Sequence, residues 1–264
     1  MLRNPWGDFE WNGDWSDKSD LWTDDIKEQC GYNDDVGLFW MSYTDICHYF
    51  SRIQVCHIND DYSYSFMKAN HTTDSYSLMR LKVSGDGEHT ITVNQTDERC
   101  FSRDSSYDYS YCRLVIFKIE EDADNLDEIK MSYVRGVSGW DRETHAMFDS
   151  LEHGDYYLYV EMDWGKDTED TEFCVSCYGV SKSFFLRDEK SLFDKHAFLR
   201  KGYASKCSQA SKYESIQVSN YDAKGAPEIK KMKEFTEEGY GFIHIANDEK
   251  EATFKEVVTF KNFQ

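Results

Sequence analysis

Proline, basic side chains and long apolar runs are scarce in this sequence. Each scarcity argues against a particular feature: a proline-rich linker, binding to nucleic acid, or a membrane-spanning helix. With only two prolines, Pro5 and Pro227, there is no proline-rich linker to mark a domain boundary. Fifty acidic residues outnumber 30 basic ones, and the formal net charge of −20 should repel nucleic acid and anionic lipid. No apolar run approaches the roughly 20 residues of a membrane-spanning helix, and the N-terminus is too polar for a signal peptide. We therefore expect a soluble, cytoplasmic protein that contains no membrane span and binds no nucleic acid.

A disulfide framework is also missing. The eight cysteines lack the short, dense spacing of a disulfide scaffold, which indicates a reducing compartment. The single C-x-x-C motif, Cys174 to Cys177, has no partner pair and lies in a strand-like run. We interpret these two cysteines as strand residues that point to opposite faces, in preference to zinc ligands.

Changes in the spacing of apolar residues divide the chain into three regions. Residues 1–58 are rich in tryptophan and should contain two short helices, residues 24–30 and 45–50, with Thr23 and Thr44 as their N-caps. The region that follows it is longer and has a strand-like pattern.

Residues 59–188 alternate β-branched or aromatic with polar side chains, as in HTITVNQT, YCRLVIFKIE and DYYLYVEMDW. Because no helical pattern separates these runs, they predict an antiparallel β-sandwich. Residues 189–264 open with a helix-like run, 191–201, and close with a hairpin-like pair, 241–246 and 254–260. This last region should either extend the sandwich or pack on it.

The N-terminal motifs carry a family resemblance. Read alone, Asn4-Pro5-Trp6-Gly7 is a turn with an aromatic anchor. The string RNPWGDFEWNGDWSD, followed by VGLFWMSYTDICHYFSRIQVC, resembles the end of the calpain protease core in order, spacing and residue type. The runs MSYVRGVSGW, GDYYLYVEMDW and EFCVSCYGVSKSFF are similar to the calpain-type β-sandwich domain. The implied fold is α+β and mainly β, with an incomplete papain-like protease subdomain followed by an antiparallel sandwich.

The resemblance implies a catalytic role for Asn4 and Trp6. Calpains cleave peptide bonds with a Cys, His and Asn constellation, in which the Cys attacks the carbonyl and the His carries the proton. Asn4 matches the Asn, whose amide oxygen would orient the imidazole, and Trp6 matches the tryptophan that would cover this hydrogen bond. The family's Cys and His both precede the Asn, where this sequence has only Met1, Leu2 and Arg3. We expect both groups to be absent from this chain.

The family also implies calcium in this half of the protease core, held by carboxylates and carbonyls. Glu10 and Asp17 match two ligands in the tryptophan loop, whereas Val36 and Leu38 replace an acidic pair. Calcium is therefore a possible cofactor at a degenerate site. The acidic residues 34–35 either compensate or form a solvated turn, and we favour the turn.

Other chemistry-bearing residues have simpler interpretations. The acidic run 120–128 either chelates calcium or forms a solvated loop, which we favour. His145 and His153 lack a third metal ligand at suitable spacing. The Cys-His neighbours 47–48 and 56–57 should point to opposite faces of a strand, which argues against a thiolate pair.

Two functions remain open. The first is a calpain-like cysteine protease chain that needs an upstream protease half to complete its site. The second is a non-catalytic pseudoenzyme that serves as a scaffold or as a subunit of a larger assembly, for example a cytoskeletal one. Truncation favours the second, because a core that begins at Asn4 exposes a sheet edge that a protein partner should cover.

Overall fold

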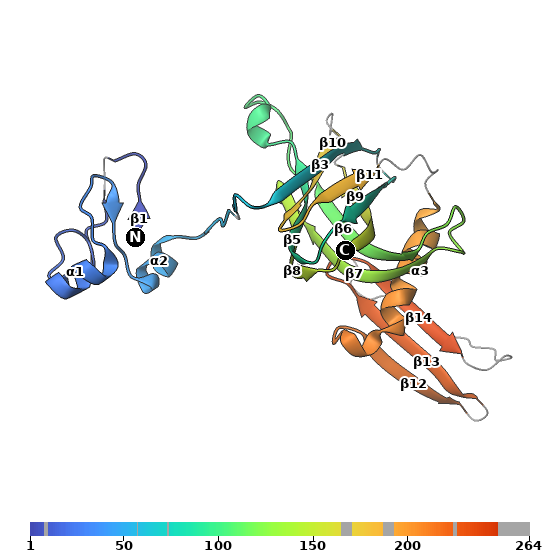
Figure 1. Cartoon of the computed structure of the whole chain (residues 1–264). Helices are drawn as coiled ribbons and strands as arrows, with labels where there is room; N and C mark the ends of the chain where they lie inside the picture. The colour runs from blue at the N-terminus through green and yellow to red at the C-terminus, as the bar shows by residue number, and fades with distance from the viewer. Residues whose placement is uncertain are drawn as a thin grey trace. The chain divides into compact units, whose positions relative to one another are not determined.

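The computed structural model divides the chain into two compact units, Met1–Ile58 and Asn59–Gln264 (Figure 1). Within the described residues, no helix has the length and apolar character needed to span a bilayer. The structure describes residues 1–7, 10–56, 58–72, 74–164, 171–186, 193–223 and 226–247.

The first unit consists of two short strands, two short helices and the loops between them. Its elements are β1 (Leu2–Arg3), α1 (Asp24–Cys30), β2 (Leu38–Phe39) and α2 (Tyr43–Tyr49). The Thr23 hydroxyl accepts a hydrogen bond from the Ile26 N–H at 3.3 Å, which confirms the predicted cap of α1.

The predicted cap of the second helix is wrong. Ser42 is the N-cap of α2, and its hydroxyl accepts the Asp45 N–H at 3.0 Å. The hydroxyl of Ser42 stands one residue before the helix, where it meets the free N–H groups, whereas Thr44 already lies inside the first turn. The helix accordingly begins at Tyr43, two residues earlier than predicted.

The second unit is built on two packed antiparallel sheets, so the predicted sandwich is confirmed. One sheet has the strand order β3-β10-β5-β8 and the other has the order β11-β4-β9-β6-β7. Every neighbouring pair is antiparallel. The elements are β3 (Ser63–Asn70), β4 (Ser77–Val83), β5 (Gly87–Gln95), η1 (Glu98–Cys100), β6 (Tyr111–Glu121), β7 (Lys130–Gly139), β8 (Glu143–Leu151), β9 (Gly154–Asp163), β10 (Glu172–Gly179) and β11 (Ser183–Leu186).

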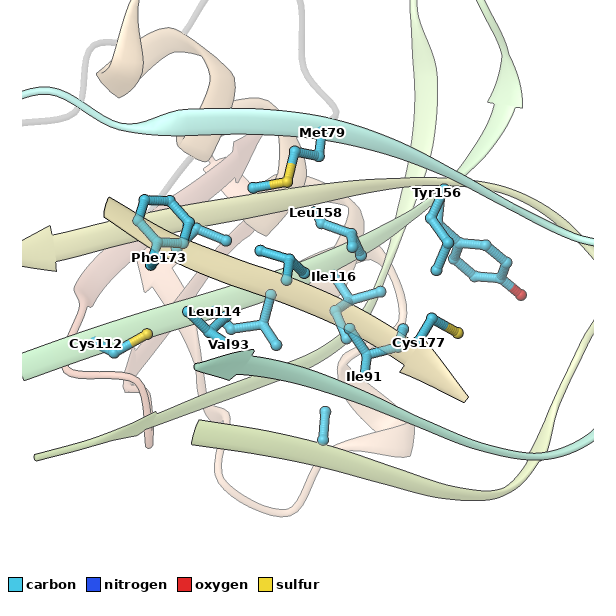
Figure 2. Packing of buried hydrophobic residues seen from close by; sticks show 14 of the residues in the cluster. Met79, Ile91, Val93, Cys112, Leu114, Ile116, Tyr156, Leu158, Phe173 and Cys177 are labelled. Carbon is cyan, nitrogen blue, oxygen red and sulfur yellow. The ribbon is translucent and has the colours of Figure 1, made fainter. Parts of the chain in front are cut away.

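The alternating side chains of these strands form the core between the two sheets (Figure 2). Ile91 from β5, Leu114 from β6 and Leu158 from β9 are each completely buried there. Cys177 is buried in this core while Cys174 is half-buried, as expected for strand positions of opposite parity.

The described part of the last region packs on the sandwich and does not extend either of its sheets. Its elements are α3 (Lys195–Ser208), η2 (Ala210–Lys212), β12 (Gln217–Ala223), β13 (Ala226–Phe235) and β14 (Gly241–Asn247), and the three strands form a separate sheet in chain order. Phe198, Leu199 and Tyr203 of α3 join a second core with side chains from the outer face of the five-stranded sheet. The predicted strand over 254–260 lies outside the described residues.

Candidate functional site

Asn4 is positioned by the small sheet of the first unit. β1 and β2 pair antiparallel, with Leu2 opposite Phe39 and Arg3 opposite Leu38. Directly after β1, the Asn4 N–H donates to the Gly37 carbonyl at 2.7 Å. The backbone of Asn4 is therefore hydrogen-bonded to the residue that precedes β2, and this bond restrains the position of the Asn4 side chain.

Gly37 is required at this contact. It has φ of 85°, and a Cβ at this position would lie 2.7 Å from the Asn4 carbonyl oxygen. Any other residue would be strained and would push the Asn4 loop away.

Residues 4–7 form the predicted turn. The Gly7 N–H donates to the Asn4 carbonyl at 3.3 Å, and the Trp6 N–H donates to the Asn4 side-chain oxygen at 3.1 Å. An amide oxygen can accept two hydrogen bonds, so the bond from Trp6 is compatible with a second bond from an imidazole N–H. The Trp6 side chain is 83% exposed, so its predicted role as a cover for that bond stays a prediction.

The two predicted calcium ligands serve as hydrogen-bond acceptors within the unit. A Glu10 carboxylate oxygen accepts the Gly37 N–H at 2.5 Å, and an Asp17 oxygen accepts the Tyr32 hydroxyl at 3.3 Å. Burial, followed by the nearby charge of Asp17, raises the pKa of Tyr32. In the described part of the chain, acidic, histidine and cysteine side chains nowhere gather in threes as a metal site needs. Because calcium takes six to eight oxygens, these residues do not fit a calcium cage.

Three cysteines of the sandwich unit are poor nucleophiles. Burial raises the pKa of the Cys112 thiol to about 12 and that of Cys177 and Cys207 to about 11. A nucleophilic cysteine needs the opposite shift, because the thiolate is the reactive form.

The structure corrects the prediction for the Cys47–His48 pair. Both residues lie on α2 and not on a strand, so adjacent side chains there diverge by helical geometry. A hydrogen bond with Cys47 raises the pKa of Tyr43, which identifies the polar neighbour of this thiol. The other predicted pair includes residue 57, which lies outside the described residues.

Two of the remaining candidates of the sandwich, the acidic run and His153, take part in local ion pairs. After β6 ends at Glu121, Asp122 in the acidic run accepts hydrogen bonds from Arg80 at 2.7 Å and Tyr157 at 2.9 Å. The exposed His153 contacts Asp86 at 2.8 Å.

Sequence reasoning missed a buried ion pair and an unpaired indole. Lys206 donates to Glu234 at 2.9 Å, and their side chains are 5% and 3% exposed. The Trp40 indole N–H is buried and has no acceptor within the described residues. Neither feature follows from local periodicity, because each depends on segments that meet only in the fold.

Comparison with known proteins places the motif region in context. Residues 1–57 match the family model described as calpain family cysteine protease, and this range contains Asn4, Trp6, Glu10 and Asp17. The rabbit (Oryctolagus cuniculus) calpain-2 catalytic subunit is 32% identical over 96 residues, which cover 35% of this chain and 21% of that protein. Calpain-B of Drosophila melanogaster is 45% identical over 65 residues, which cover 23% of this chain and 7% of that protein.

The chain therefore spans only a small part of the relatives it matches. Among solved structures, the P-domain of Macrobrachium rosenbergii nodavirus matches with 13% identity and a TM-score of 0.20, covering 46% of this chain and 94% of that chain. A similarity of this size supports no conclusion about fold or function.

Proposed function

Because its N-terminal segment makes this chain a member of the calpain family of cysteine proteases, we propose that it contributes the orienting asparagine, Asn4, to a protease active site. The thiol nucleophile and the imidazole base come from polypeptide outside these 264 residues. By itself the chain has no peptidase activity.

The observation that carries this proposal is the fixed position of Asn4. Its backbone is tied to Gly37 and its carbonyl closes the turn to Gly7, so the amide is held at the end of a strand. A side chain that orients a catalytic base must itself be held by its surroundings. An amide oxygen accepts the imidazole N–H without adding the negative charge of an aspartate.

Four of the eight thiols have surroundings that do not suit a nucleophile, which supports the proposal of an external one. Burial raises the pKa of Cys112, Cys177 and Cys207, which suppresses their thiolate forms. Cys47 has a tyrosine hydroxyl as its polar neighbour, and a phenol with raised pKa does not act as a base near neutral pH. An orienting amide without nucleophile and base gives no acceleration, because these two groups supply most of it.

A chimera tests the proposal. The part of the rabbit calpain-2 catalytic subunit that precedes its matched segment is fused to Met1 of this chain, and cleavage of a fluorogenic peptide is measured for the chimera and for the chain alone. We expect turnover by the chimera and none by the chain. Turnover by the purified chain would contradict the proposal, and so would an inactive chimera whose circular dichroism shows a folded protein.

An inactive but folded chimera would support the second candidate, a non-catalytic subunit of a larger assembly. The observations in favour of this candidate are the apolar core of the sandwich unit and the formal net charge of −20 of the whole chain. An acidic protein of this kind suits a basic protein partner. We propose a cytoplasmic location for either function, and a cytoskeletal one for the second.

Calcium enters neither proposal. Glu10 and Asp17 are engaged with Gly37 and Tyr32, and among the described residues they do not form part of a cluster of three acidic, histidine or cysteine side chains. We therefore derive no catalytic or regulatory step through a metal ion.

A further inference from the structure

The outer face of the four-stranded sheet carries aromatic side chains. In β3, Met67 and Ala69 pack against the core, whereas Tyr64 and Phe66 point outward and are 63% and 61% exposed. This alternation arises because neighbouring side chains of a strand face opposite sides of the sheet. Single large apolar side chains are common on protein surfaces, but a contiguous group of them indicates a binding surface.

The exposed rings belong to one continuous row across β10 and the start of β3. Its members, in spatial order, are Tyr62, Tyr178, Tyr64 and Phe66, and we call them the aromatic row. The centroids of successive rings lie 6.3, 6.4 and 5.9 Å apart, and the planes of successive rings differ by 32°, 29° and 35°. The rings are therefore almost evenly spaced and similarly inclined.

Hydrogen bonds restrain two of these rings. The Tyr64 hydroxyl lies 3.1 Å from the hydroxyl oxygen of Ser176, a residue that is only 3% exposed. A hydrogen bond with Glu88 raises the pKa of Tyr62, which places a carboxylate beside that hydroxyl. A ring that is already held by its hydroxyl loses little conformational freedom when a partner stacks on its face.

Acidic side chains outnumber basic ones on the same face. The outward positions of its strands carry Glu88, Glu143 and Glu172, against one lysine, Lys68. Lys68 is itself paired with Glu172 at 3.3 Å. The acidic residues 60–61 directly precede the aromatic row. Negative charge beside exposed ring faces favours a cationic partner, because both features attract a cation.

The spacing of the rings fits an extended polypeptide. Alternate side chains of an extended chain lie about 6.6 Å apart, which is twice the rise of about 3.3 Å per residue. Arginine suits the ring faces better than lysine, because its planar guanidinium stacks on aromatic rings and is weakly hydrated. The chain contains an example of this contact, since the guanidinium carbon of Arg113 lies 4.5 Å from the centre of the Tyr111 ring.

We propose that the aromatic row is the docking site for an extended segment of a partner protein in which arginine occupies alternate positions. The guanidinium groups would lie over the exposed faces of Tyr64 and Phe66, and the acidic side chains around the row would balance their charge. This inference concerns the second unit alone. It goes beyond the proposed protease role and does not depend on Asn4.

Peptide binding to the full chain tests the proposal. The probe is a fluorescein-labelled decapeptide of alternating arginine and serine, and its binding is followed by fluorescence anisotropy at about 150 mM salt, where nonspecific charge attraction is screened. A decapeptide of alternating lysine and serine has the same charge and spacing. We expect the arginine peptide to bind about 5-fold more tightly, because the guanidinium stacks on the rings.

Variants assign this preference to the aromatic row. Tyr64→Thr combined with Phe66→Thr removes two rings, leaves the charge unchanged and keeps side chains that suit a strand. It should weaken binding of the arginine peptide about 10-fold, as expected for two exposed cation–π contacts. Phe184→Thr is the matched control, because Phe184 lies on β11 of the other sheet and is 50% exposed, and it should change nothing.

The single substitution Phe66→Thr keeps the test informative should the double variant fail to fold. It leaves the hydrogen bond of Tyr64 in place and should weaken binding about 3-fold. Circular dichroism identifies the folded variants.

The remaining outcomes would overturn the docking site. Equal affinities for the two peptides, or equal weakening by Phe184→Thr and by the double substitution, would show that binding follows net charge alone. Binding of phosphatidylserine vesicles that the double substitution abolishes would identify a membrane surface as the occupant. Peptidase activity of the chimera is measured separately, so an active chimera without ring-dependent peptide binding would overturn this inference and leave the proposed function intact.

Discussion

His71 is a single residue whose imidazole the sandwich keeps unprotonated. Its Nε2 accepts the Met162 N–H at 3.0 Å, which requires an unprotonated nitrogen, and Nδ1 lies 3.0 Å from the Ser77 hydroxyl. Its carbonyl accepts the indole N–H of Trp164 at 2.8 Å. Burial lowers the pKa of His71 to about 4. The ring is therefore a structural hydrogen-bonding group and not a catalytic one.

His71 should make the sandwich sensitive to acid. The unfolded chain takes up the proton near pH 6.5 and the folded one only near pH 4, so stability is full above pH 6.5 and falls as the pH drops toward 4. The loss should reach about 3 kcal/mol at most. Urea unfolding of the wild type and of His71→Gln at pH 7 and pH 5 measures it, and the variant should lose less between the two pH values. His145→Gln, at an exposed position, should lose as much stability between pH 7 and pH 5 as the wild type does.

The buried pair of Lys206 and Glu234 joins α3 to β13. One Glu234 oxygen accepts from Lys206 at 2.9 Å and from Ser215 at 2.5 Å, and the Lys206 ammonium lies 4.4 Å from the centre of the Tyr133 ring. The pair is thus enclosed by the sandwich and the last region together. Removal of either partner would leave a charge buried without compensation.

Lys206→Met should therefore destabilise the second unit by about 3–5 kcal/mol. Lys130→Met is the matched control, because Lys130 and Glu121 form a pair whose side chains are 67% and 63% exposed, and it should change stability by less than about 1 kcal/mol. Chemical denaturation gives both values. Equal effects of the two substitutions would contradict the burial of the Lys206 pair.

At the scale of elements, α3 is the layer that joins the sandwich to the last sheet. Gly202 lets the helix approach the five-stranded sheet, because a Cβ there would lie 2.2 Å from a ring carbon of Phe117. Helix propensity alone favours alanine over glycine by about 1 kcal/mol. The close contact with Phe117 disfavours alanine, and we expect this steric cost to exceed the gain in helix propensity.

Gly202→Ala should accordingly destabilise the second unit by about 1–3 kcal/mol, against the sign of helix propensity. Arg200→Ala, at an exposed position of the same helix, should stay within about 0.5 kcal/mol of the wild type. Thermal unfolding followed by circular dichroism distinguishes the two variants. A stabilising Gly202→Ala would show that α3 does not pack against Phe117.

Local patterns explain which elements could be predicted. The sandwich strands are rich in β-branched and aromatic residues that alternate with polar ones along the sequence, so β5, β6, β9 and β10 could be predicted. The structure nevertheless buries consecutive residues in each of these strands, which the sequence pattern did not predict. β13 was missed because the run IKKMKE reads as charged surface, although β12 and β14 pair with it on both sides. The position of Asn4 could be predicted only through the family motif, since its ties to Gly37 join segments far apart in sequence.

At the scale of the whole molecule, the two units differ in what stabilises them. The second unit has two packed sheets, a covering helix and three apolar clusters. The first has Phe39 as the buried apolar side chain of its described part. Apolar burial is the main favourable term in folding, so the first unit should be the less stable of the two.

Hydrogen exchange should reveal this difference directly. In the chain alone, peptides from residues 1–56 should exchange at least about 100-fold faster than peptides from β6 and β9, because low local stability permits frequent opening. In the chimera, residues 1–56 should become protected. Equal protection of both units in the chain alone would show that the first unit is stable without a partner.

On our proposal, Asn4 orients a catalytic imidazole supplied from outside this chain. The most direct test is kcat/KM for peptide cleavage by the chimera with Asn4→Ala, beside Asn12→Ala as an exposed asparagine of the same unit. We expect kcat/KM to fall about 100-fold for Asn4→Ala, as for a misplaced catalytic group, and not to change for Asn12→Ala. An active chimera with equal kcat/KM for Asn4→Ala and for the unsubstituted protein would contradict it.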